Sequence, residues 1–420
     1  MKVVADLHIH SRYSQACSRS INIDNLEKYA RIKGLNLLGT GDFAHPQWNK
    51  ELKEKLKEDG SDVLKTESGF PFVLQTEISN IYSQGGRGRR VHNVILARSF
   101  EVVDQIIEAL LKRGRLDYDG RPIFGFSCVE LVEMMKGIDK DVEVIPAHAW
   151  TPWFSVFGSK SGFDSIEECF QDQAKHIHAI ETGLSSDPPM NWRLSELDKY
   201  TLISNSDSHS YWPWRIGREA NVFDLHEITY DNIINAIRSG DPKRFLYTIE
   251  VDPSYGKYHI DGHRACNVHV HPSESSKINN VCPVCKGKLT VGVLSRVEEL
   301  ADRPVGYVPE GRVPFKSIIP LTEIISSVTG ISQLYSKKTW DTYNKLITKF
   351  GSELSVLLDK SRNTLRTVVD SKLANAIVDL REGRVEIQPG YDGVYGKILF
   401  DGKAEPNTEL TKIQKNITDF

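Results

Sequence analysis

Cysteines and long apolar runs are scarce in this 420-residue sequence, and each scarcity excludes a class of protein. The six cysteines are scattered except for the last three, which is a poor framework for disulfides and fits a reducing, cytoplasmic compartment. No apolar run approaches the roughly 20 residues that span a bilayer, so we expect no membrane segment. The N-terminus enters a polar, histidine-containing motif at once, which argues against a signal peptide.

Neither sign of charge is in large excess. The chain has 53 Lys and Arg against 56 Asp and Glu, for a net charge of −3. Binding to nucleic acid would therefore have to come from local basic patches. The hydrophobic content of 40% and charged content of 26% are typical of a globular protein. The length predicts about two to three domains.

Candidate metal ligands accompany a series of short apolar segments that we interpret as buried strands. The first is Asp6-Leu7-His8-Ile9-His10, where two histidines at i and i+2 on a strand point to the same side. Later segments carry Asp42 and His45, Glu77, His92, His148, the group His176, His178 and Glu181, and finally Asp207 and His209. For any single residue the alternative is a structural hydrogen bond or, for Asp42, a helix N-cap. One metal centre explains the repetition better than seven coincidences.

Segments with helical periodicity lie between these strands. They cover residues 23–33 with Asn22 or Asp24 as the N-cap, and residues 101–112, 129–136, 166–175 and 190–199. Strand then helix, repeated about seven times, predicts a parallel α/β barrel. In such barrels the functional side chains lie where the strands end. We therefore expect a multinuclear metal centre that activates water to hydrolyse a phosphoester.

Residues 1–245 resemble the PHP (polymerase and histidinol phosphatase) superfamily. The resemblance rests on Asp6 to His10, Gly41-Asp42, Glu77, His92, Pro146-Ala147-His148 and Asp207-Ser208-His209. It implies a distorted (β/α)7 barrel with two or three divalent metals (Zn, Mn or Mg). By position, one metal is held by His8, His10, Glu77 and Asp207; a second by Glu77, His92 and His148; and a third by His209 and residues near Asp42. Phe43 and Gln15-Ala16-Cys17 stand where the superfamily often has histidines, so Asp42, His45 or Cys17 would have to complete the third site.

Two features beside these motifs suggest contacts with DNA. A glycine-rich basic segment before His92 contains Arg87, Arg89 and Arg90, which could fork onto phosphates. Aromatic residues follow two of the ligand motifs, and Trp150 and Trp212 are apt for stacking on bases. The alternatives are an exposed hairpin tip and aromatic packing that shields the metals.

Residues 246–310 contain the spacing of a closed structural zinc site. His263-x2-Cys266 is followed after 15 residues by Cys282-x2-Cys285. His269 and His271 are rivals for the histidine position, and we favour His263. The surrounding polar segment has few apolar residues, so we expect bound zinc to supply the folding energy of this module.

Residues 311–405 are predicted to be mainly helical, and a tail follows at 406–420. Helical patterns cover residues 321–329, which end at Gly330, then 337–350, 352–360 and 364–380, before a hairpin at 384–400. The tail residues Gln414, Ile417 and Phe420 fit Q-x-x-I-x-x-F, which resembles a box that binds the sliding clamp PCNA. The alternative is a polar tail without a partner.

Over residues 1–405 the chain resembles the endonuclease Q family of DNA repair enzymes, chiefly at residues 258–264, 282–285 and 289–303. This resemblance implies hydrolysis of double- or single-stranded DNA on the 5′ side of deaminated bases (uracil, hypoxanthine, xanthine) and abasic sites, leaving 3′-hydroxyl and 5′-phosphate. The alternatives are a histidinol-phosphatase-like phosphomonoesterase and a non-catalytic partner of a polymerase. Neither the Cys/His module nor the helical module would be needed by a monoesterase.

Overall fold

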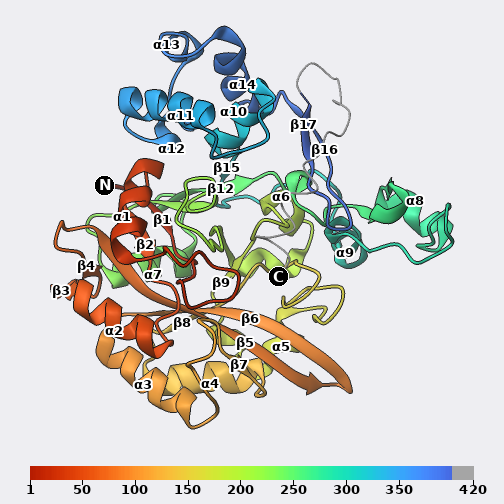
Figure 1. Ribbon diagram of the computed structural model, residues 1–420. Helices are drawn as coiled ribbons and strands as arrows, with labels where there is room; N and C mark the ends of the chain where they lie inside the picture. Colours follow the sequence, from red (N-terminus) through yellow and green to blue (C-terminus); the bar gives the residue numbers. More distant parts are fainter. Residues whose placement is uncertain (400–420) are drawn as a thin grey trace.

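The computed structural model describes residues 1–399 and shows an α/β body that carries two smaller modules (Figure 1). The Cys/His module extends to one side around α8 (Pro272–Ser275), and the helical module lies over another part of the body. The predicted clamp-binding residues Gln414, Ile417 and Phe420 lie outside the described residues. Within residues 1–399, no helix combines the length and the apolar character needed to cross a membrane.

Seven strands form a ring around an apolar interior. In order around the ring they are β1 (Lys2–Asp6), β2 (Leu37–Gly39), β5 (Pro71–Gln84), β6 (Arg87–Ala97), β8 (Glu143–Pro146), β9 (Ala179–Glu181) and β10 (Thr201–Ile203). Backbone hydrogen bonds from Ala149 N to Glu181 O and from His10 N to Ser208 O, both 2.9 Å, connect β8 to β9 and β10 to β1. This arrangement confirms the predicted α/β fold with a distorted barrel.

One strand breaks the predicted alternation of strand and helix. β5 and β6 form a long hairpin that extends beyond the barrel (Figure 1) and turns at Gly85 and Gly86, where φ is 60° and 72°. Glycine adopts these values at little cost, which favours this turn. Because β6 runs antiparallel to β5 and β8, its first half faces the barrel end at which the parallel strands finish. His92 therefore reaches the ligand end from the middle of β6 and not, as predicted, from the start of a strand.

Capping residues mark where the helices around the barrel begin and end. α1 (Ile23–Lys33) begins at Asn22, whose side chain accepts a hydrogen bond from Asn25 N, and ends at Gly34 with φ 103°. The others are α2 (Pro46–Lys55), α3 (Phe100–Leu111), α4 (Cys128–Ile138) and α7 (Tyr230–Ser239). The helices predicted at 166–175 and 190–199 are each divided, into α5 (Ile166–Phe170) and α6 (Pro188–Asn191) followed by 3-10 turns. At Gln171 a φ of 49° interrupts the first of them.

The sheet continues from β1 into strands that lie later in the chain. β11 (Ala220–Asp224) pairs with β1, β12 (Phe245–Val251) pairs with β11, and β15 (Phe315–Ile318) pairs in parallel with β12. The short strands β4 (Leu64–Lys65) and β7 (Ile123–Phe124) pair with β5, and β3 (Lys57–Glu58) pairs with β4. A segment that follows the Cys/His module thus completes the sheet, while the domain limits at 245, 310 and 405 stay predictions.

The C-terminal elements mostly match their predicted positions. α10 (Leu321–Thr329) and α11 (Lys337–Phe350) begin and end as predicted, and α12 (Glu353–Leu358) lies within its predicted range. The helix predicted at 364–380 is divided into α13 (Arg362–Leu365) and α14 (Ser371–Arg381), because Asp370 caps a new helix. The remaining elements are β13 (Asp261–His263), β14 (Val268–Val270), α9 (Val293–Leu300) and the hairpin of β16 (Glu386–Gln388) with β17 (Lys397–Leu399).

Candidate metal centre

Two groups of ligand-type side chains meet at one end of the barrel and share Glu77. Ligand atoms within 4.8 Å of one another come from two sets of residues, which are His8, His10, Glu77 and Asp207, and Glu77, His92 and His148. Glu77 Oε2 lies 3.3 Å from His10 Nε2, whereas Glu77 Oε1 lies 2.8 Å from His92 Nδ1. The two oxygens of one carboxylate therefore face different groups, as a bridging ligand requires. Imidazole and carboxylate donors suit divalent cations such as zinc and manganese.

Unusual backbone conformations accompany three of the polar residues at this barrel end. Asp42, His148 and Asp207 have φ values of 38°, 31° and 47°. Such values are uncommon for residues other than glycine, and they persist where surrounding contacts hold the backbone in place. Each residue follows the end of a strand, so the backbone turns where its side chain enters the site.

Two buried carboxylates outside these groups orient two of the histidines. Glu181 Oε2 lies 3.0 Å from His8 Nδ1, and Asp42 Oδ1 lies 2.9 Å from His10 Nδ1. Each contact leaves the histidine Nε2 facing the shared centre, which is how second carboxylates commonly support metal-binding histidines. Asp42 also accepts hydrogen bonds from Ser11 N and Ser14 Oγ. Protein donors contact both oxygens of Asp42, so its clearest role in the structure is to orient His10, and its role as a metal ligand stays a prediction.

The residues predicted for a third metal do not form a comparable group. The His209 ring lies 4.6 Å from the His10 ring, and His209 Nδ1 is 3.0 Å from the Asp207 carbonyl oxygen. His45 stacks on Tyr13 with ring centroids 4.4 Å apart. Among the described residues, the two groups at this barrel end are those that share Glu77. The third metal stays a prediction.

The carboxylates of the centre are held in the charged form. Burial alone would raise the pKa of Glu77, but the charges of His92 and Arg121 and hydrogen bonds from His10 and His148 hold it well below its ordinary value. The pKa of Asp207 is also held well below its ordinary value, because a hydrogen bond from His10 and neighbouring histidine charges outweigh burial. Both side chains can therefore bind cations near neutral pH.

Arg121 is a candidate functional residue that the sequence did not suggest. Its Nη1 donates to Glu77 Oε2 at 3.2 Å, and its side chain is 24% exposed. It lies in the loop before β7, outside every strand and helix. The Asp119-Gly120 pair before it is a turn signal, but no pattern ties that turn to the metal ligands.

The predicted DNA-contacting arginines differ in exposure. Arg87 and Arg90 are exposed on β6, and the Arg90 guanidinium lies 5.6 Å from the Phe154 ring. Arg89 is buried, donates to Glu168 Oε1 at 3.0 Å and covers the Phe163 ring at 4.0 Å. The Arg89 guanidinium thus contacts protein groups, whereas its contact with DNA stays a prediction.

The two predicted base-stacking tryptophans are packed against protein. Trp150 is 1% exposed, stacks on Phe157 and donates to Asn191 Oδ1 at 2.8 Å. Its ring and indole N–H are packed against protein, and its contact with DNA stays a prediction. Trp212 is partly exposed and stacks on Trp214 at 5.2 Å. Its role in binding DNA stays a prediction.

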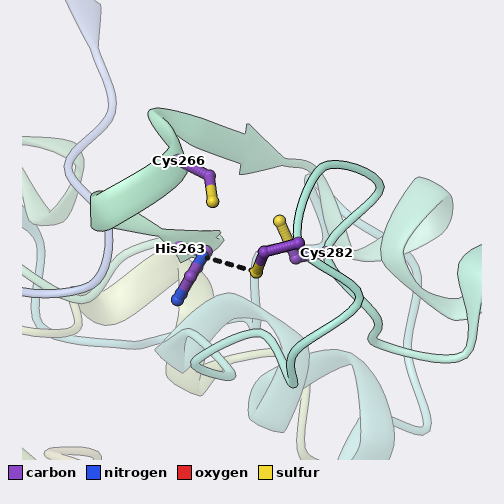
Figure 2. Close-up of side chains that lie close together, drawn as sticks. His263, Cys266 and Cys282 are labelled. Atoms are coloured by element: carbon purple, nitrogen blue, oxygen red, sulfur yellow. Dashed lines mark hydrogen bonds between the residues drawn. The ribbon is translucent and has the colours of Figure 1, made fainter.

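The Cys/His module brings its four predicted ligands together. His263, Cys266, Cys282 and Cys285 have ligand atoms within 4.8 Å of one another. Figure 2 shows the side chains of His263, Cys266 and Cys282 converging from separate segments. Three thiols and one imidazole in a closed set fit a structural zinc ion.

The rival histidines have other contacts. His269 packs against the Tyr391 ring at 4.9 Å, and His271 caps α8 by accepting from Ser273 N. His263 Nδ1, in contrast, lies 3.5 Å from Cys285 Sγ. The structure therefore groups His263, and neither rival, with the three cysteines.

Sequence relatives cover different parts of the chain. Residues 320–384 match the family described as the MJ0043 C-terminal domain. The uncharacterized protein YqxK of Bacillus subtilis is 30% identical over 415 residues, which cover 94% of this chain and 99% of YqxK. The uncharacterized protein MJ0043 of Methanocaldococcus jannaschii is 35% identical over 258 residues, which cover 60% of this chain and 31% of that protein. The chain thus spans under a third of MJ0043 and nearly all of YqxK.

Two solved structures match almost the whole chain. The lesion-specific endonuclease PfuEndoQ from Pyrococcus furiosus is 32% identical, with a TM-score of 0.85 over 95% of each chain. The chain belongs to the endonuclease Q family. A structure of endonuclease Q with a 27-mer duplex substrate that has an abasic lesion at the active site also gives a TM-score of 0.85 and 32% identity, over 95% of this chain and 96% of that one. The resemblance to endonuclease Q is confirmed, and it includes the barrel and both modules.

Proposed function

We propose that this member of the endonuclease Q family is a metal-dependent DNA repair endonuclease that cuts on the 5′ side of a damaged nucleotide. Its proposed substrates contain uracil, hypoxanthine, xanthine or an abasic site, and its products end in 3′-hydroxyl and 5′-phosphate. The supporting observation is the pair of ligand groups that share Glu77, in a chain that aligns over 95% of its length with an endonuclease Q bound to lesion-containing DNA.

The donor set of the centre fits divalent zinc, manganese or magnesium, with His8, His10 and Asp207 on one side of Glu77 and His92 and His148 on the other. Bound divalent ions would supply an activated water and charge stabilisation for the phosphodiester. Glu181 and Asp42 hold His8 and His10 in the orientation that presents Nε2 to the centre.

A damaged base would have to leave the stack to reach this centre. Extrusion costs least for mismatched or missing bases, which suits deaminated bases and abasic sites. In this proposal the Cys/His and helical modules contact the duplex while the barrel cuts it. The tail residues Gln414, Ile417 and Phe420 would bind the sliding clamp PCNA, and loss of PCNA binding on Phe420→Ala in the full chain would test that partner.

Cleavage of defined duplexes tests the proposed activity. Labelled duplexes with a single uracil, hypoxanthine or abasic site are incubated with Mg²⁺, Mn²⁺ or Zn²⁺, beside an undamaged duplex and p-nitrophenyl phosphate. We expect one cut 5′ to the lesion, lost in Asp207→Asn and His8→Ala but kept in His226→Ala, which changes an exposed histidine. Release of phosphate from the small ester with intact DNA would support the histidinol-phosphatase-like monoesterase instead.

A further inference from the structure

A tight turn fixes Arg121 beside the ligand groups. Gly120 N donates to Tyr13 O at 3.1 Å, and Arg121 N donates to Asp119 Oδ1 at 3.0 Å. On the other side of Arg121, the Pro122 carbonyl accepts from Ser79 N of β5 at 3.0 Å. The backbone on both sides of Arg121 is therefore tied to segments that line the centre.

The turn packs directly on the residues that orient His10. A Cβ atom at Gly120 would overlap the Asp42 carboxylate and Ser14 Oγ, so only glycine allows this approach. Asp42 in turn contacts His10 Nδ1. The turn that holds Arg121 therefore packs against Asp42, which in turn orients His10.

Most N–H donors of the Arg121 guanidinium have no hydrogen-bond acceptor among the described residues. Among the described residues its hydrogen-bond acceptor is Glu77 Oε2, which takes one N–H from Nη1. A guanidinium carries five N–H donors in a planar fork. Because 24% of the side chain is exposed, the remaining donors can meet a ligand that enters the centre.

Other arginines close to the ligand motifs are already engaged. Arg218 donates twice to the Ser206 carbonyl oxygen, at 3.2 and 3.0 Å. Arg12 donates to Ile21 O at 3.2 Å and to Glu51 Oε2 at 2.5 Å. Within the described part of the chain, Arg121 differs from both in making one side-chain hydrogen bond where they make two, and that bond goes to a residue of the ligand groups.

We propose that Arg121 binds the phosphate at the cleavage site, an inference that rests on the proposed phosphodiesterase function. Its guanidinium would donate to the non-bridging oxygens of the phosphate, for which a planar, permanently charged fork is well suited. Donors fixed in advance at oxygens that gain charge during the reaction accelerate phosphoryl transfer. The ligand class is a phosphate oxyanion, bound at the exposed part of the Arg121 guanidinium.

Three variants and three measurements test this assignment. Arg121→Gln and Arg121→Lys are compared with Arg115→Gln, which changes an exposed arginine of the same loop that pairs with Asp117. We expect Arg121→Gln to lower kcat on a lesion duplex by about 10²–10³-fold, the usual cost of removing one such donor. Arg121→Lys should keep part of the rate, and Arg115→Gln should match the wild type. Metal content by mass spectrometry should be unchanged in all three.

Calorimetric titration with inorganic phosphate is the readout that does not depend on cleavage. We expect the metal-loaded wild type to bind phosphate at least ten times more tightly than folded Arg121→Gln does, with Arg121→Lys between them. Loss of metal in parallel with activity would overturn the proposal, because Arg121 would then serve only to hold Glu77. Unchanged kcat or unchanged phosphate affinity would also overturn it. A wild type that binds phosphate through Arg121 but leaves damaged DNA intact would refute the proposed function alone.

Discussion

At the scale of single residues, Glu181 supports the metal centre without belonging to either ligand group. It is fully buried, contacts His8 Nδ1 at 3.0 Å and accepts from Asn205 Nδ2 at 2.9 Å. Glu181→Gln would weaken the orientation of His8, and such supporting contacts are commonly worth about 10–100-fold in metal affinity. We expect this loss in a titration of apo protein with zinc or manganese.

The matched control for Glu181→Gln is Glu227→Gln, which changes an exposed glutamate in the same way. It should bind metal like the wild type. If Glu181→Gln also retained wild-type affinity while His8→Ala lost metal, the proposed orienting role of Glu181 would be refuted.

Glu250 on β12 makes stability depend on pH. It is fully buried and accepts from Thr182 Oγ1 and Ser204 Oγ, both at 3.0 Å. Burial raises the pKa of this carboxyl to about 8 from 4.5. The folded state therefore favours the protonated form, and its contribution to stability is lost as pH rises from about 4.5 through about 8.

We expect the free energy of unfolding of the wild type to fall, relative to that of Glu250→Gln, as pH rises across this range. Glutamine keeps an oxygen that can accept from both hydroxyls but cannot ionise. Urea unfolding of both proteins at a series of pH values measures the difference. Parallel pH curves would show that Glu250 does not titrate in this range.

The grouping of the candidate ligands could be predicted from the sequence, whereas their surroundings could not. His8, His10 and Asp207 could be predicted because each lies at or beyond the end of an apolar strand. Arg121 could not, because it lies in a loop and approaches Glu77 only through tertiary packing. The burial of Trp150 could not be predicted, because its position two residues after His148 does not determine how exposed its side chain is.

At the scale of elements, the bounds of helices could be predicted from local sequence signals, whereas the direction and pairing of strands could not. α10 and α11 were predicted with their observed bounds, since apolar periodicity covers both and Gly330 and Ser336 mark the end of one and the start of the other. The antiparallel direction of β6 was missed, because periodicity identifies a strand and not its partner. The pairing of β15 with β12 joins segments more than sixty residues apart, which no local pattern reports.

The Cys/His module is the element whose folding should depend on metal. Its four ligands come from the end of β13, the turn at 264–266 and the turn at 282–287. A bound metal ion would join these three segments to one another. We expect a strong chelator to increase hydrogen exchange in residues 261–290 while strand β1 stays protected. Because thiolates and neutral imidazole bind metal, the chelator should act faster as pH falls.

The control for chelation is Cys169→Ser, which changes a buried cysteine of the barrel outside the cluster. Its module should still respond to chelator, whereas Cys285→Ser should show fast exchange before chelator is added. Unchanged exchange in the chelated wild type would mean that packing alone folds the module.

At the scale of the whole molecule, the modules are interlocked with the barrel. From the Cys/His side, Arg296 donates to Phe163 O at 3.0 Å and Arg303 to Asp198 Oδ1 at 2.9 Å. On the helical side, Lys33 at the end of α1 donates to Glu353 Oε1 of α12 at 2.8 Å. With β15 added to β12, these contacts favour unfolding of the barrel and the helical module as one unit.

The Lys33–Glu353 pair offers the sharpest test of this interlocking. Both side chains are 0% exposed, and Glu353 also accepts from Leu321 N and Tyr343 OH. Removing one charge of a buried pair leaves the other unpaired and costs about 3–5 kcal/mol. We expect Glu353→Gln to lower the free energy of unfolding by about that amount in a single urea transition. Lys33→Met combined with Glu353→Gln should recover part of it, because no buried charge is then unpaired.

The matched control is Glu274→Gln, which breaks the exposed Lys277–Glu274 pair and should change stability little. Tryptophan fluorescence follows the whole molecule, and hydrogen exchange in β1 and α14 follows barrel and helical module separately. If Glu353→Gln destabilised α14 but left β1 as protected as in the wild type, the module would unfold independently of the barrel. Equal loss of protection in β1 and α14 is expected, because the buried charge lies between elements that must separate for either part to unfold.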